Sequence, residues 1–249
     1  MKKIKQLGIF DSGLGGYSIY RDLKRHLEPV SLVLYADQGN APYGNQSPEA
    51  IIQYTEKAMM WFHRQGILDV IVACNTVSAV ALETIRSRFP DMKIVGIIEL
   101  TVENLTHPEA MKVAVVSTLA TFNSHAYRDL IECKSPLAIT ELALPELVNI
   151  IEGLNPNLDI EKYLEIELIP VMDATDLILG CTHFPLVYDV FSKIFNGRIH
   201  DSIIPIRNYV CQEYQFTETG CHTYTTGDPK MMEAQIQSLF GDEEKVELI

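Results

Sequence analysis

The chain has 249 residues, 47% of them apolar and 21% charged, which is typical of a globular protein with a sizeable core. Its formal net charge of −13 argues against nucleic-acid binding, because that needs a basic surface. A small anionic substrate is still compatible with a local site rich in N–H donors. No segment has about 18 uninterrupted apolar residues, so we expect no membrane span and no membrane partner.

Short apolar runs alternate with amphipathic stretches along the whole chain. In the first part, this alternation predicts strands at 7–10, 31–36, 68–74 and 93–98 and helices at 17–27, 48–66 and 78–89. After Glu99 it predicts strands at 112–118, 137–144 and 175–181, helical segments at 123–133, 145–173 and from Pro185, a short strand near Ile199, and helices near 206–214 and from Pro229. This βαβα order indicates an α/β fold with mostly parallel, buried strands.

A weak internal repeat relates the two halves. GIFDSGLGG at 8–16 has the same place in the first half as AVVSTLATFNS at 114–124 in the second, and ACNTVSA at 73–79 corresponds to GCTHFPL at 180–186. Any two α/β units are alike to some degree. If the repeat reflects structure, two similar domains face each other, and each contributes one cysteine to a central cleft.

The cysteines indicate a reducing compartment. Their number is odd, no two have CxxC spacing, and several follow apolar runs; they are Cys74, Cys133, Cys181, Cys211 and Cys221. A disulfide framework is therefore not expected, and we predict a cytoplasmic protein.

Polar and glycine-rich loops follow the predicted strands, where ligands of α/β folds bind. DSGLGG at 11–16 combines an acid, a hydroxyl and three glycines, but its spacing is neither a dinucleotide nor a P-loop pattern, and a capped helix start explains it as well. The long loop YADQGNAPYGNQSPE at 35–49 is equally compatible with a binding loop and a simple surface loop.

Cys74 and Cys181 end two apolar runs in similar settings, and several roles are open for them. Neither loop supplies the arginine of a phosphatase nucleophile, and no standard zinc spacing is complete, so we expect no metal site. A nucleophilic Cys181 with His183 leaves Cys74 unexplained. Two buried structural cysteines remain a simple alternative.

Acid–base catalysis by two thiols explains both cysteines. A chiral carbon held between them can lose a proton to one and gain a proton from the other, provided that one sulfur is a thiolate and the other a thiol. A free cysteine has a pKa of about 8.5, so neighbouring groups must lower it. By motif, Asp11 and His183 are the nearest candidates for this assistance, while Asn75, Thr76 and Thr182 would bind carboxylates.

These motifs together resemble the cofactor-independent glutamate racemases of the aspartate/glutamate racemase superfamily. The resemblance extends over nearly the whole chain. It rests on GIFDSGLGG (8–16), YADQGNAPYG (35–44), ACNTVSA (73–79), GIIE (96–99), STLATFNSHAY (117–127), LGCTHFPL (179–186), DS (201–202) and TTGD (225–228).

The resemblance implies two similar α/β domains, 1–98 plus 210–249 and 99–209, with the active site in the cleft between them. It implies interconversion of L- and D-glutamate, without pyridoxal phosphate or any other cofactor, to supply peptidoglycan synthesis. Cys74, assisted by Asp11, and Cys181, assisted by His183, would be the two bases. The residues that would contact the substrate are Asp11, Ser12, Pro42, Tyr43, Gly44, Asn75, Thr76, Thr118, Thr121 and Thr182. A homodimer is compatible with the resemblance.

Three positions depart from the family pattern. Leu100 replaces the usual Pro after GIIE, and Ala120 replaces the usual Gly in the second-domain loop. The family also has a PLVE segment whose glutamate lies near the second cysteine. Here the matching place falls at Val148 or Asn149, and a glutamate occurs only at Glu146 or Glu152.

Two other functions therefore stay open beside glutamate racemisation. The same two-thiol chemistry could act on aspartate or another amino acid. A catalytically impaired paralogue could instead act as a binding protein.

Overall fold

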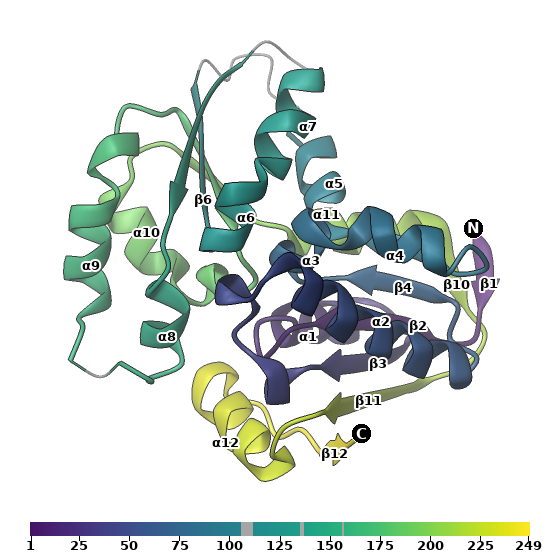
Figure 1. The fold of residues 1–249 in the computed structure, drawn as a ribbon. Helices are drawn as coiled ribbons and strands as arrows, with labels where there is room; N and C mark the ends of the chain where they lie inside the picture. The colour runs from purple at the N-terminus through teal and green to yellow at the C-terminus, as the bar shows by residue number, and fades with distance from the viewer. Residues whose placement is uncertain (106–111, 135–136, 156) are drawn as a thin grey trace.

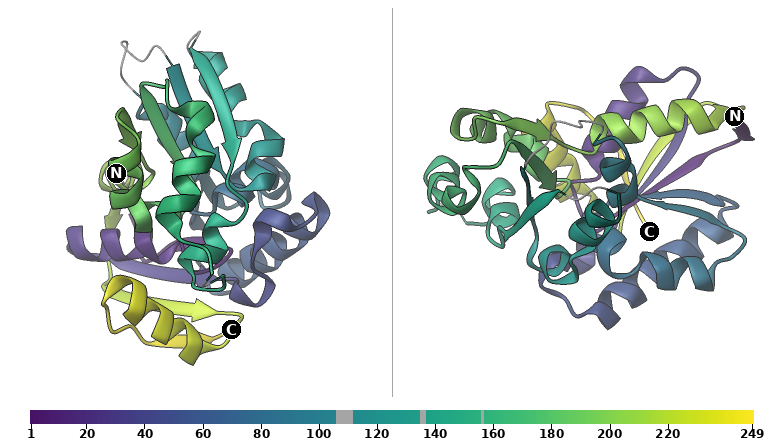
Figure 2. Two further views of the ribbon diagram at one scale, coloured as in Figure 1. Left: turned by 90° about the vertical axis from the view of Figure 1, so that its left-hand side faces the viewer. Right: turned by 90° about the horizontal axis from the view of Figure 1, so that it is seen from above.

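The computed structural model describes residues 1–105, 112–134, 137–155 and 157–249 and shows two lobes, each built on its own sheet (Figure 1). The first sheet has the strand order β12–β11–β3–β2–β4–β5, and the second has the order β7–β6–β8–β9. Every strand pair in both sheets is parallel. The right-hand view of Figure 2 shows the two lobes side by side.

The strands of the first sheet are β2 (Leu7–Asp11), β3 (Ser31–Ala36), β4 (Asp69–Val72), β5 (Lys93–Gly96), β11 (Gly220–Thr225) and β12 (Val246–Leu248). Those of the second are β6 (Lys112–Ser117), β7 (Ala138–Ala143), β8 (Asp176–Gly180) and β9 (Arg198–His200). A separate parallel pair joins β1 (Lys2–Ile4) to β10 (Tyr214–Phe216). Strands β2 to β5 and β6 to β9 share one order within their sheets, so the internal repeat in the sequence reflects a structural repeat.

Helices cover both faces of each sheet. Those of the first lobe are α1 (Tyr17–His26), α2 (Pro48–Arg64), α3 (Asn75–Val80), α4 (Leu82–Arg88), α11 (Ile203–Glu213) and α12 (Pro229–Phe240). Those of the second are α5 (Ile97–Glu103), α6 (Leu119–Ser124), α7 (Ala126–Lys134), α8 (Leu147–Ile151), α9 (Ile160–Glu167) and α10 (Tyr188–Ile194). Four short 3₁₀ turns complete the described elements: η1 (Gln38–Asn40), η2 (Tyr43–Asn45), η3 (Ile169–Val171) and η4 (Phe184–Val187).

The core follows the alternation of side chains along the strands. In β2, Ile9 packs into one hydrophobic cluster and its neighbour Phe10 into another on the opposite face. The cluster on the Ile9 side also contains Val115 of β6 and Ile131 of α7. Apolar packing is therefore continuous between the lobes, and it supports the site between them.

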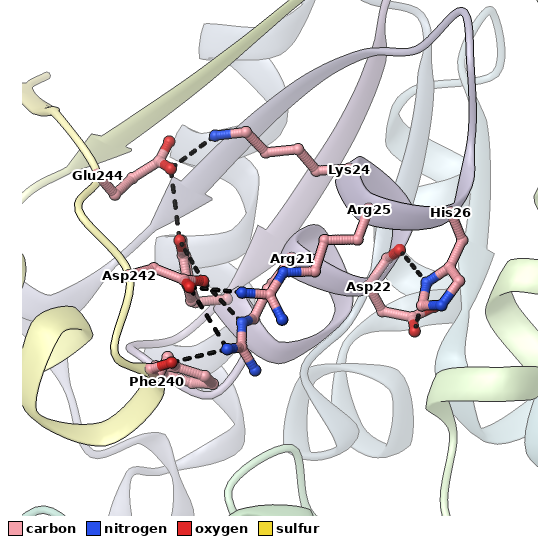
Figure 3. A network of polar contacts seen from close by, with 9 residues as sticks. Arg21, Asp22, Lys24, Arg25, His26, Phe240, Asp242 and Glu244 are labelled. Atoms are coloured by element: carbon pink, nitrogen blue, oxygen red, sulfur yellow. Dashed lines mark hydrogen bonds and ion pairs between the residues drawn. The ribbon is translucent and has the colours of Figure 1, made fainter.

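The C-terminal segment is fixed to α1 by a network of charges (Figure 3). Arg21 donates to Asp242 Oδ2 at 2.6 Å and to the carbonyl oxygen of Phe240 at 2.7 Å. Lys24 and the phenol of Tyr20 donate to Glu244, at 2.8 Å and 2.9 Å. These contacts hold the end of α12 against the first lobe, and α12 itself reaches the cavity described below.

The fold class predicted from the sequence is confirmed, while several boundaries differ. The strand expected at 68–74 ends at Val72, and the helix expected at 78–89 begins already at Asn75 and is interrupted at Ala81. The strand expected at 93–98 ends at Gly96, because Ile97 to Glu103 form α5.

Further differences lie in the rest of the chain. The helical segment expected at 123–133 begins at 119 and is broken at His125, which has a left-handed φ of 55°. The region expected to be helical at 145–173 contains only α8, α9 and η3 as helical elements, and its residue 156 lies outside the described residues. The division into domains at 98/99 and 209/210 stays a prediction; α11, which spans the second boundary, contacts both α1 and α5.

Candidate active site

A cavity of about 210 Å³ lies between the lobes, at the carboxyl edges of both sheets. The first lobe contributes to its lining Ser12, Gly13, Gln38, Ala41, Pro42, Tyr43, Gly44, Cys74, Asn75, Thr76, Met231 and Gln235. The second contributes Thr118, Val148, Asn149, Glu152, Leu154, Cys181, Thr182 and His183. All the sequence-predicted site residues except Asp11 and Thr121 are among them, and those two lie directly behind the lining.

Cys74 lies between β4 and α3 and is 4% exposed. Its sulfur is 3.2 Å from the hydroxyl oxygen of Ser12. Burial raises the pKa of the Cys74 thiol to about 12, and the charge of Asp11 acts in the same direction. Without substrate, Cys74 is therefore a protonated thiol at neutral pH.

Asp11 ends β2 and is completely buried. Its Oδ2 accepts from the backbone N–H of Gly16 at 2.8 Å and from the hydroxyl of Thr182 at 3.3 Å. Its Oδ1 has no hydrogen-bond partner among the described residues. Burial raises the pKa of Asp11 to about 6, although the charge of His183 and these hydrogen bonds lower it. Asp11 thus lies within the range in which a carboxyl group can exchange protons near neutral pH.

Cys181 directly follows β8, and His183 and Glu152 form a chain of contacts beside it. His183 Nδ1 is 3.9 Å from Cys181 Sγ, and His183 Nε2 is 2.7 Å from Glu152 Oε1. Burial favours the neutral imidazole, but the contacts with Cys181 and Glu152 outweigh it and raise the pKa of His183 to about 10. His183 is therefore an imidazolium at neutral pH, and a neighbouring cation favours the thiolate form of a cysteine.

The position of Glu152 decides a point that the sequence left open. The family pattern placed the equivalent of its glutamate at Val148 or Asn149, and the glutamates available nearby were Glu146 and Glu152. In the structure Val148 and Asn149 line the cavity as well, and the carboxylate next to His183 belongs to Glu152, at the end of α8. One helical turn separates Val148 from Glu152, which brings both to the same side of α8.

Threonine hydroxyls from both lobes meet at one wall of the cavity. The hydroxyl oxygens of Thr76 and Thr118 are 2.9 Å apart, and those of Thr118 and Thr121 are 3.1 Å apart. Thr118 also caps α6, because its side chain accepts from the backbone N–H of Thr121. This cluster offers neutral hydrogen-bond donors across the boundary between the lobes.

Asn75 adds a further neutral donor, and Tyr43 fixes a loop of the lining. Asn75 Nδ2 is buried and has no partner among the described residues. Tyr43 donates its hydroxyl to Asp37, whose other oxygen accepts from Thr226, and this fixes the loop at 37–44. None of the described lining residues is a lysine or arginine, so an anionic substrate would be held by hydroxyl and amide groups.

The sequence did not identify every lining residue. Met231 and Gln235 come from α12, and Figure 1 shows this helix near α8 of the other lobe. Gln38 donates to Gln235 Oε1 at 2.9 Å and so connects the loop after β3 to α12. The sequence motif that could have indicated these two residues is TTGD at 225–228. It lies at the end of a strand and directly before α12, at the edge of the sheet where ligands bind.

No three His, Cys, Asp or Glu side chains within the described ranges are arranged to hold a metal ion. In the same part of the chain, no helix has the length and apolar character that crossing a membrane requires.

The two similar lobes and the enclosed pair of thiols with ionisable partners define an enzyme that works in the cleft between α/β domains. Residues 8–204 match the Asp/Glu/Hydantoin racemase family. A glutamate racemase from Gloeobacter violaceus is 31% identical over 235 residues, which cover 90% of this chain and 88% of that protein. The chain therefore belongs to the Asp/Glu/Hydantoin racemase family, and it is a racemase.

Solved structures agree with this assignment. Glutamate racemase isoform RacE1 from Bacillus anthracis has a TM-score of 0.90 at 22% identity, with 100% of this chain and 98% of that chain covered. Glutamate racemase from Aquifex pyrophilus has a TM-score of 0.84 at 28% identity, with 98% of each chain covered. The resemblance inferred from the motifs is thus confirmed.

Proposed function

We propose that the protein interconverts the enantiomers of glutamate by proton transfer at the α-carbon between Cys74 and Cys181. One observation carries this proposal. The two cysteines occupy equivalent places in two repeated lobes, line one cavity, and each has its own ionisable neighbour. Two structural cysteines would need neither the shared cavity nor these neighbours.

The reaction begins with the two sulfurs in different protonation states. The mechanism requires a thiolate on Cys181, and the His183 imidazolium, whose Nδ1 lies 3.9 Å from Cys181 Sγ, supplies a positive charge beside it. Burial and the charge of Asp11 keep Cys74 protonated. The Cys181 thiolate removes the α-proton from the enantiomer whose α-hydrogen faces it. The electron pair of the broken C–H bond passes into the α-carboxylate, and the Cys74 thiol then protonates the opposite face of the carbon.

This turnover leaves Cys181 as a thiol and Cys74 as a thiolate, which is the state needed for the opposite enantiomer. Asp11 and His183 are placed to return the protons and reset the pair. Glu152 holds the imidazole of His183 and stabilises its charge through the 2.7 Å contact. Each half of the site thus consists of one thiol and one group that controls its proton.

The substrate would be recognised by neutral donors. Asn75, Thr76 and Thr118 offer amide and hydroxyl groups to carboxylates, and Thr121 supports them from behind. Thr182 lines the same cavity, and its hydroxyl would turn from Asp11 to a bound carboxylate. Ser12, Pro42, Tyr43 and Gly44 line the remaining wall, as expected from the resemblance. The similarity to proteins named glutamate racemases favours glutamate over aspartate. We further propose that the D-glutamate formed serves peptidoglycan synthesis.

Circular dichroism of purified protein tests the proposal directly. L-glutamate, D-glutamate and L-aspartate are supplied separately, without added cofactor. We expect the signal of both glutamate enantiomers to decay to zero. If only the aspartate signal decays, the substrate is aspartate and not glutamate. If no signal decays, the proposed racemase activity is contradicted.

Alanine variants of the two cysteines test the mechanism. Cys74→Ala and Cys181→Ala should each abolish racemisation and leave the far-ultraviolet spectrum close to that of the wild type. Unchanged activity in the Cys74→Ala protein would contradict proton transfer by two thiols.

A further inference from the structure

Tyr127 contacts both of the loops that carry the cysteines. It belongs to α7 of the second lobe and is completely buried. Its hydroxyl donates to Asn75 Oδ1 of the first lobe at 2.6 Å. Its ring packs on Gly180, the residue before Cys181, so closely that a Cβ atom at Gly180 would lie 3.0 Å from Tyr127 Cε2.

The hydrogen bond from Tyr127 determines which end of the Asn75 amide is free. The oxygen of this amide is occupied by the phenol, whereas Nδ2 is buried and has no partner within the described ranges. A buried amide donor without a partner is unfavourable unless a ligand satisfies it. Asn75 lines the cavity directly beside Cys74, so a substrate carboxylate is the acceptor that fits this position.

The surroundings of Tyr127 keep its hydroxyl as the donor in this contact. Burial raises the pKa of the phenol above its ordinary value, while hydrogen bonds from the hydroxyls of Thr101 and Ser202 lower it. The phenol is therefore protonated at neutral pH. Because an amide oxygen can only accept, the phenol is the donor to Asn75 Oδ1.

We propose that Tyr127 is a positioning residue, which turns the amide nitrogen of Asn75 toward the substrate carboxylate and keeps the two cysteine loops in register. The hydroxyl performs the first task and the ring performs the second. The identity of the carboxylate rests on the proposed function, whereas the contacts with Asn75 and Gly180 do not depend on it.

The test is a double-mutant cycle of Tyr127→Phe and Asn75→Ala. Phenylalanine keeps the ring on Gly180 and removes only the hydroxyl. We expect Tyr127→Phe to raise the KM for glutamate about tenfold with a smaller change in kcat, which is the size expected when one buried hydrogen bond is lost. In the Asn75→Ala background, the same substitution should change KM by less than about twofold, because no amide remains to be oriented.

Tyr20→Phe is the matched control. Tyr20 is also completely buried and donates one hydrogen bond, at 2.9 Å to Glu244, but Glu244, unlike Asn75, does not line the cavity. The Tyr20→Phe protein should lose about as much stability as Tyr127→Phe, and its KM for glutamate should equal that of the wild type. An unchanged KM in Tyr127→Phe, or an effect of equal size with and without the Asn75 amide, would overturn the inference.

Calorimetric titration with glutarate separates this inference from the proposed function. Glutarate carries two carboxylates and cannot be racemised, so its binding is measurable even if the wild type leaves glutamate unchanged. We expect the Kd of glutarate to rise about tenfold in Tyr127→Phe and to stay unchanged in Tyr20→Phe. Equal binding of glutarate by all three proteins, or binding by none, would overturn the role of Tyr127. The proposed activity is tested separately, by whether the wild-type protein racemises glutamate.

Discussion

Asp11→Asn is expected to stabilise the protein while it lowers activity. The carboxyl group is completely buried, and its pKa is raised from 3.8 to about 6. Such an acid holds its proton more tightly in the folded than in the unfolded state. Ionisation therefore reduces stability as the pH rises from about 4 to about 6, and the full penalty applies above pH 6.

The size of this penalty follows from the pKa values. At 1.36 kcal/mol per pKa unit, a rise from 3.8 to about 6 corresponds to about 3 kcal/mol at pH 8, of which only a small part is already present at pH 4. Asparagine is neutral throughout and can still accept from the N–H of Gly16. The stability of Asp11→Asn relative to wild type should therefore increase by about 2 kcal/mol between pH 4 and pH 8.

Urea unfolding of both proteins at fixed pH values measures this difference. Packing changes caused by the substitution affect all pH values alike, so the change with pH reports the ionisation of Asp11 together with its coupling to the charge of His183. A constant difference from pH 4 to pH 8 would refute the argument. In the same variant, racemisation should fall by a factor of about 10² to 10⁴, the usual contribution of a positioned acid–base group.

Asp176→Asn provides the control with the opposite sign. Burial would raise the pKa of Asp176, but hydrogen bonds from Arg198, His200 and Thr175 outweigh it and lower this pKa to about 2. Its charge thus stabilises the fold above about pH 4, and this contribution is lost as the pH falls toward 2. The variant should be less stable than wild type, by an amount that changes little between pH 4 and pH 8.

Three further outcomes follow from the site and its supports. Glu152→Gln should lower the pKa of His183 from about 10 by roughly 1–3, and the alkaline limit of kcat/KM should move to lower pH with it. An unchanged alkaline limit would show that Glu152 has no part in the proton transfer. Gly15→Ala places a Cβ atom 2.3 Å from Thr182 Oγ1 and should reduce kcat/KM about 100-fold in a folded protein, whereas wild-type kinetics would show that the loops move apart freely. Asp242→Asn should lower the free energy of unfolding by about 1 kcal/mol, and by less at high salt; equal loss at all salt concentrations would contradict an ionic contact with α1.

Much of the fold could be predicted from the sequence because its strands are short, apolar and regularly spaced. The repeated pattern of a cysteine after an apolar run also predicted two equivalent lobes. The strand end at Val72 and the helix start at Asn75 were less accessible, since the apolar run continues through Ala73 and Cys74. Strand β12 was not predicted, because only its pairing with β11 makes that short terminal segment a strand.

The site was predictable where one motif holds several of its groups. CNT and CTH place a thiol beside its neighbours within three residues. Glu152 could not be assigned in this way, because the position of its carboxylate depends on how α8 is turned against η4. Met231 and Gln235 were missed since they reach the cavity only through the packing of α12 on the first lobe.

Hydrogen transfer in D₂O tests the two-thiol account most directly. L-glutamate is incubated with the enzyme in D₂O. Early in the reaction, the two enantiomers are separated, and the deuterium content of each is measured by mass spectrometry. If the α-proton leaves to one sulfur and a deuteron arrives from the other, the D-glutamate formed carries deuterium while the remaining L-glutamate does not. D-glutamate that retains the original hydrogen would show that a single base serves both faces, and it would contradict the roles assigned to Cys74 and Cys181.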